Sequence, residues 1–231
     1  MGDEEQNEQA EVGQSTLQST VVAPSGYRSW TDYWRDLNRL QSAAMLSSTP
    51  PEGYSLWKDY WTEQGMSWRK MPEIDEERKV FLAQRRAIEP DVVQGIYPFK
   101  DVELNRADIE WLLATHEAEG QIGPVRWPPL EEENEYRVGS DLRGAMLATL
   151  DLSYLPLTRI IGGLDQEIFP DATPNQREAA AMNLQGANLS GCKLQEAELA
   201  AVRLQGALLW NAELTSAKLG DANLDEADLY G

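Results

Sequence analysis

The sequence is poor in the residues that carry much of protein chemistry, since its 231 residues include one histidine and one cysteine. His116 has no second histidine or cysteine at ligand spacing, so we expect no metal site and no catalytic triad. A lone cysteine forms no internal disulfide, and we expect Cys192 to be a buried thiol. Phosphate loops and nucleophile elbows are missing too. We therefore predict that the protein is not an enzyme and uses no cofactor.

Basic residues are also scarce. Lysine and arginine number 20 against 39 aspartates and glutamates, which gives a net charge of −19. Nucleic acids and anionic membranes bind positive faces, so direct binding to either is not expected. The acidity either keeps the protein soluble or forms a surface that imitates DNA.

Long hydrophobic runs are absent as well. No stretch approaches the roughly 18 apolar residues of a membrane-spanning helix. The N-terminus has neither the basic region nor the apolar region of a signal peptide. These absences predict a cytoplasmic protein.

The sequence does contain a leucine at every fifth position of its last fifty residues. A small or apolar residue, most often alanine, stands two positions before each leucine. The leucines of this ladder are Leu184, Leu189, Leu194, Leu199, Leu204, Leu209, Leu214, Leu219, Leu224 and Leu229.

A period of five fits neither a helix, which turns every 3.6 residues, nor a flat strand, which alternates every two. All the leucines point inward only if the chain turns one corner in each repeat. Four corners close a coil of about twenty residues, and successive coils stack at the strand spacing of ~4.8 Å. The pattern therefore predicts a solenoid with a narrow interior, which a filling of leucine and alanine leaves without a cleft.

The triplets Ala187-Asn188-Leu189 and Ala222-Asn223-Leu224 resemble the pentapeptide-repeat family, whose pattern is A-(D/N)-L-x-x. The resemblance implies a mainly β fold, a right-handed quadrilateral β-helix. It implies a specific role only for part of the family. Some members imitate duplex DNA and bind DNA gyrase, whereas most have no assigned activity.

Composition divides the chain into three parts. Residues 1–22 are polar and acidic and are expected to be disordered. Residues 23–95 are expected to form a helical N-terminal region. Residues 96–231 are expected to form the β-helix, with a Pro/Glu-rich loop at 120–138 and a helical insertion between coils at 158–181.

Three helices are expected between residues 73 and 182. Residues 73–88 carry acids early and arginines late, as the helix dipole favours, and their charges are expected to form a solvated face. A short helix is expected at 108–119, although Ala107-Asp108-Ile109 also fits the pentapeptide pattern. Thr173 followed by proline predicts the start of a third helix, at 173–182.

The N-terminal region also holds a second repeat, because residues 24–34 return as residues 51–61 with seven of eleven positions identical. Each copy reads as a Pro-x-Gly turn followed by a short helix bearing a tryptophan pair. These aromatic side chains either pack in the core or form a duplicated docking segment, and a ligand platform is a third possibility. The candidate docking residues are Trp30, Tyr33, Trp34, Trp57, Tyr60 and Trp61.

Together these features favour a non-catalytic interaction or scaffold protein that binds a protein partner of unknown identity. One alternative is an acidic DNA mimic that binds DNA gyrase or topoisomerase. Another is a homo-oligomer that stacks through an uncapped coil end, because bare strand edges favour pairing.

Overall fold

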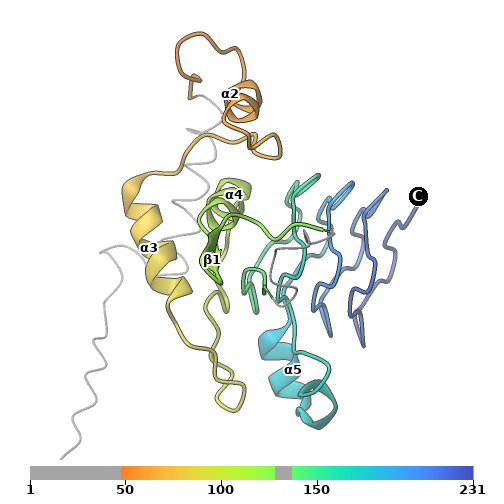
Figure 1. The fold of residues 1–231 in the computed structure, drawn as a ribbon. Coiled ribbons are helices and arrows are strands. Elements are labelled where there is room, and N and C mark those ends of the chain that lie inside the picture. Colours follow the sequence, from red (N-terminus) through yellow and green to blue (C-terminus); the bar gives the residue numbers. More distant parts are fainter. Residues whose placement is uncertain (1–47, 128–136, 231) are drawn as a thin grey trace, which may run out of the picture.

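The computed structural model describes residues 48–127 and 137–230. A stack of coils makes up the C-terminal part, with helices at one end of the stack and the C-terminus at the other (Figure 1). The expected tail at 1–22, the first aromatic copy at 24–34 and the middle of the loop at 120–138 lie outside the described residues.

Each repeat of the coil closes a corner through its own backbone. The amide of Ala187 donates to the carbonyl of Leu184 at 3.0 Å, and Ala197 repeats this with Leu194 at 3.1 Å. The residue before each donor has a positive φ, 66° at Gly186 and 55° at Glu196, as the third residue of a type II turn requires. The inferred corner in every repeat is therefore confirmed.

Neighbouring coils are joined in parallel at a separation of twenty residues. Bridges join Asn183 to Arg203, and the same offset recurs at the next four repeats and at Leu208 with Asp228. Each bridge involves a single residue, so regular strands do not extend along the coil. The only strands named within the described residues are β1, Glu117–Ala118, and β2, Gln121–Ile122. The repeat coil is thus present, but in place of long strands it has isolated bridges.

The leucine ladder forms the interior of the stack. From Leu184 to Leu209 the ladder leucines are at most 3% exposed, and the small residues that precede them are buried with them. Burying one such leucine contributes roughly 1.5–3 kcal/mol. Cys192 occupies one of the small positions, and burial raises the pKa of its thiol to about 12. It is a core residue, as expected.

The insertion begins later in the chain than the sequence indicates. Asp141 and Ile161 are bridged twenty residues apart, whereas Ile161 pairs with Glu198 across 37 residues, so seventeen residues are inserted after Ile161. Residues 158–161 therefore belong to the coil and not to the insertion. The period of five is hard to see in the sequence here because Gly162 stands at a leucine position. An added Cβ on Gly162 would lie 2.7 Å from the Cε of Met182, which occupies the space.

The inserted residues include a short 3₁₀ helix, Phe169–Asp171, and helix α5, Pro174–Ala180. Thr173 is the N-cap of α5 and forms a capping box with Gln176, which confirms the expected start. In Figure 1, α5 lies beside the coils.

One helix covers the first coil, residues 141–161, and a second helix is joined to that helix by a buried ion pair. Helix α4, Arg106–Ala114, buries Trp111, Leu112 and Leu113 against the coil leucines. The helix expected at 108–119 is wrong at both ends, because Asn105 caps α4 and residues 117–122 form the β1–β2 hairpin. That hairpin also takes the start of the loop predicted at 120–138. Residues 107–109 are consequently helical and do not form a coil repeat.

Helix α3, Glu76–Arg86, begins three residues later than expected, since Asp75 accepts a hydrogen bond from the amide of Arg78 and caps it. Its charged face is not wholly solvated. The guanidinium of Arg78 is buried and donates to both carboxylate oxygens of Asp108 at 3.0 and 2.8 Å. This ion pair joins α3 to α4. None of the helices in the described ranges is long and apolar enough to cross a bilayer.

We predict that Arg78→Ala lowers the free energy of unfolding by about 3–5 kcal/mol, because Asp108 would keep a buried charge without its partner. The measurement is equilibrium denaturant unfolding. Lys79→Ala is the control, since Lys79 pairs with the exposed Glu76 and should cost less than about 1 kcal/mol. Equal losses for the two variants would contradict a structural role for the buried pair.

Candidate interaction surface

The second aromatic copy folds as a turn followed by helix α2, Trp57–Glu63. The amide of Tyr54 donates to the carbonyl of Pro51 at 3.2 Å, and Gly53 has a φ of 97°, so the Pro-x-Gly turn is confirmed. No side chain caps α2 at Leu56. The intrinsic helix propensity of a seven-residue segment is too weak to keep α2 folded, so packing of its aromatic rings must stabilise it.

Four rings of this copy form one cluster. Tyr60 is central, with ring centroids 4.8 Å from Trp61, 5.4 Å from Tyr54 and 5.9 Å from Trp57. Trp57 and Trp61 stack at 6.2 Å with an interplanar angle of 26°. Aromatic pairs at these distances and angles are attractive beyond the area they bury. We call these four residues the aromatic cluster.

The members of the aromatic cluster differ in exposure. Trp61 is 7% exposed, its indole nitrogen donates to the carbonyl of Met71 at 2.7 Å, and the guanidinium of Arg69 lies 3.7 Å from its ring centroid. Trp57 and Tyr60 are only half-buried. Trp61 is thus a packing residue, and Trp57 and Tyr60 are the accessible candidates. Trp30, Tyr33 and Trp34 lie outside the described residues.

A hollow of about 720 Å³ lies between α2 and the coil, outside the filled interior of the coil. It exists because flanking segments, and not the coil alone, form its walls. Trp68 and Tyr154 line it, together with the hydroxyls of Thr62, Ser67 and Ser153. Its charged lining residues are all basic, and we call it the basic hollow: Lys58, Lys70, Arg106 and Lys193.

Arg106 fixes the walls of the basic hollow. Its guanidinium donates to the carbonyls of Asp151 at 2.7 Å, Ser153 at 3.1 Å and Trp68 at 3.3 Å, and to the buried carboxylate of Glu110 at 2.7 Å. Because α4, the segment after α2 and the first coil all meet at this side chain, the hollow has a defined shape.

Asp151 is the acid nearest to these bases, with its carboxylate bonded to the ammonium of Lys70. Partial burial raises its pKa, but hydrogen bonds from Lys70 and Ser153 outweigh burial and lower the pKa to about 2. A carboxyl whose folded pKa is depressed stabilises the fold above its ordinary value of 3.8. That contribution is lost as the pH falls from there toward 2.

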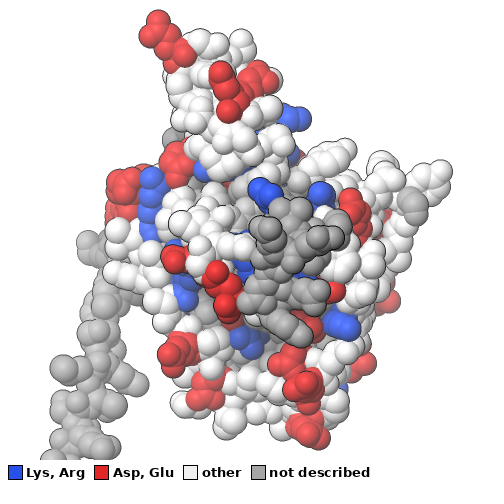
Figure 2. All heavy atoms as spheres, in the orientation of Figure 1, with Lys and Arg blue, Asp and Glu red and all other residues white. Residues whose placement is uncertain are grey.

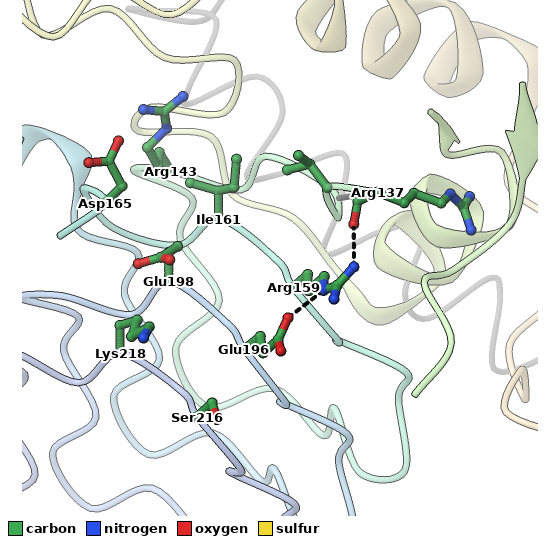
Figure 3. A pocket seen from close by; sticks show the side chains of 10 residues that line it. Arg137, Arg143, Arg159, Ile161, Asp165, Glu196, Glu198, Ser216 and Lys218 are labelled. Carbon is green, nitrogen blue, oxygen red and sulfur yellow. Dashed lines mark hydrogen bonds and ion pairs between the residues drawn. The ribbon is translucent and has the colours of Figure 1, made fainter. Parts of the chain in front are cut away.

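A second hollow, of about 600 Å³, adjoins the coil where Arg159, Glu196 and Glu198 project (Figure 3). Its charges are largely compensated internally. Arg159 pairs with Glu196 at 2.6 Å, and Arg143 pairs with Asp141. Burial raises the pKa of Glu198, and the nearby ammonium of Lys218 partly offsets this rise. This hollow is therefore lined by charges of both signs, unlike the basic hollow.

His116 follows α4, with Nε2 2.8 Å from the carbonyl oxygen of Val138, and burial lowers its pKa. Within residues 48–127 and 137–230, no group of three His, Cys, Asp or Glu is placed to hold a metal ion. No pattern in the sequence predicts the basic hollow. Its residues come from four separate segments, and no sequence spacing connects them.

We predict that Lys70→Met raises the pKa of Asp151 from about 2 toward 3.8, because it removes the ammonium that stabilises the carboxylate. Nuclear magnetic resonance titration of the carboxyl carbon measures this value. Lys100→Met is the matched control, since that ammonium bonds the carbonyl of Gly95. An unchanged pKa of Asp151 in Lys70→Met would show that the bond is absent in solution.

Comparison with known proteins supports a repeat coil in the C-terminal part of the chain. The family model of pentapeptide repeats matches residues 183–219 and 192–231, with eight copies. This family model describes a repeat and not a catalytic domain. A search of curated proteins finds no match.

Two solved structures from cyanobacteria are similar to part of the chain. HetL from Nostoc sp. strain PCC 7120, a pentapeptide repeat protein involved in heterocyst differentiation regulation, is 31% identical over 38% of this chain and 35% of its own, with a TM-score of 0.26. Rfr23 from Cyanothece 51142, a pentapeptide repeat protein, is 26% identical over 38% of this chain and 46% of its own, with a TM-score of 0.26. The match thus spans less than half of either structure. With its corners, its bridges at twenty residues and the family match, the segment 183–231 belongs to the pentapeptide-repeat family.

Proposed function

We propose that this chain is a non-catalytic interaction or scaffold protein, in which the coil stack is a rigid support and the aromatic cluster binds a protein partner. The observation that carries this proposal is the placement of Trp57 and Tyr60, half-exposed and packed on the buried Trp61. Tryptophan and tyrosine supply much of the binding energy in interfaces, above all where they are already ordered.

The supporting coil is, in this proposal, a right-handed quadrilateral β-helix in a cytoplasmic protein. Four bridged positions in each period of twenty residues support the quadrilateral form. The sequence copy at 24–34 would add a second docking segment, and two tethered segments raise affinity by avidity.

Imitation of DNA has less support. Figure 2 shows basic side chains among the acidic ones on the face drawn, and this mixture weakens the negative potential that a DNA mimic would present there. The basic hollow, in the same molecule, would attract an anion and not a DNA-binding protein.

We predict that the double variant Trp57→Ala/Tyr60→Ala loses a partner that the intact protein captures from its native cell extract, while the thermal unfolding of the coil, which does not depend on these rings, changes little. Trp210→Ala is the control, because Trp210 is a 46% exposed tryptophan on the coil. Capture of the same proteins by the double variant would contradict the docking role of the aromatic cluster. The coil would then be the surface to test next.

Self-association is the second candidate, and the last repeats favour it. Leu214, Leu219 and Leu224 are only partly buried, and Leu229 and Tyr230 are 53% and 80% exposed. Contiguous apolar surface of this kind favours contact with another apolar surface.

Self-association predicts a mass above that of the monomer in light scattering as the concentration rises. Leu229→Glu should restore the monomer, because it places a charge in the contact. A monomer at every concentration would exclude this candidate.

A further inference from the structure

We propose that the basic hollow binds a small ligand that carries both phosphate groups and a flat ring, the chemical class of nucleotides. This site is separate from the protein-docking role of the aromatic cluster. Its volume of about 720 Å³ lies within the range of about 300–1,000 Å³ that small-ligand pockets occupy.

The charge of the hollow is opposite to that of the protein. The chain carries a net charge of −19, yet every charged residue that lines this hollow is basic. Lys70 and Arg106 are partly neutralised by Asp151 and Glu110. Lys58 and Lys193 form no ion pair with any residue of 48–127 or 137–230. Two lysines are therefore available to an anion.

The acids of α2 do not cancel this charge. Glu63 accepts a hydrogen bond from the hydroxyl of Tyr54, within the aromatic cluster. Neither Asp59 nor Glu63 is among the residues that line the hollow. An anionic ligand thus meets ammonium groups and hydroxyls first, and lysine ammonium groups commonly bind phosphate in proteins.

Tyr154 gives the hollow a fixed aromatic surface. It is 71% exposed, although its ring packs on the next coil at Gly191, where an added Cβ would come within 2.6 Å of the ring. Glycine at 191 therefore makes room for the ring, which lies close to the backbone beneath it. Trp68, half-buried, is the second aromatic residue of the lining. A flat ring can stack on such a surface without further ordering of the protein.

The walls of the hollow are held before any ligand arrives. Arg106 bonds the carbonyls of Trp68, Asp151 and Ser153, so the segment after α2 and the first coil keep their separation. Preorganisation of this kind reduces the cost of ordering the site on binding. The arrangement depends on where α2 and α4 meet the coil.

The test is binding of adenosine triphosphate to the full chain by titration calorimetry, with tripolyphosphate, adenosine and a hexaglutamate peptide as comparison probes. We expect saturable binding of adenosine triphosphate that weakens as salt rises. The double variant Lys58→Gln/Lys193→Gln should weaken it at least tenfold. The control Lys79→Gln/Lys218→Gln removes the same charge elsewhere and should leave affinity within twofold.

Tyr154→Ala separates the ring contact from the charge contact. It should weaken the binding of adenosine triphosphate about tenfold and leave the affinity for tripolyphosphate unchanged. Thermal unfolding checks that the variant folds. Absence of binding at millimolar adenosine triphosphate would overturn the proposal. So would equal weakening by the control lysine pair, or affinity for tripolyphosphate equal to that for adenosine triphosphate. Binding of hexaglutamate without either phosphate probe would assign the hollow to an acidic peptide instead.

Discussion

The whole stack depends on one backbone corner in every five residues. A corner hydrogen bond such as Ala187 to Leu184 returns the chain so that the next leucine again faces inward. Because corners recur four times in each period, the amides and carbonyls of successive coils meet in parallel register, as at Asn183 and Arg203. From Met182 to Leu209 the narrow interior holds one leucine and one small or apolar side chain per repeat, whereas the first coil also buries Leu155 at a small position. A larger residue at the small position would have to displace a neighbour in a close-packed interior.

The first coil has a different neighbour, because α4 lies over it where a further coil would otherwise stack. Trp111 and Leu112 supply the apolar cover. Two buried carboxylates of the same helix, Asp108 and Glu110, bind Arg78 and Arg106. These pairs connect α3, α4 and the coil into one packed body. Buried ion pairs stabilise little on their own, but each leaves a costly charge when its partner is lost. They therefore favour one arrangement of the helices over others.

The accessible chemistry of this protein lies where α2 meets one side of that body. Trp61 is anchored at Met71, and this leaves Trp57 and Tyr60 half-exposed. On the coil side of α2, Lys58 and Lys193 approach one hollow although they are far apart in the sequence. A regular solenoid gives a surface of repeating small features. The irregular segments that pack on it create the sites that can distinguish one ligand from another.

The sequence by itself determined the coil, since a strict period of five leaves the chain one way to bury every leucine. It also indicated the Thr173 cap and the buried Cys192, because caps and ladder positions are local signals. Only the tertiary structure decided that Gly162 continues the coil, since Met182 fills the space of the missing leucine. It also decided which tryptophan is buried and where the basic hollow lies. Those outcomes depend on contacts between residues distant in the chain, and a local pattern carries no information about them.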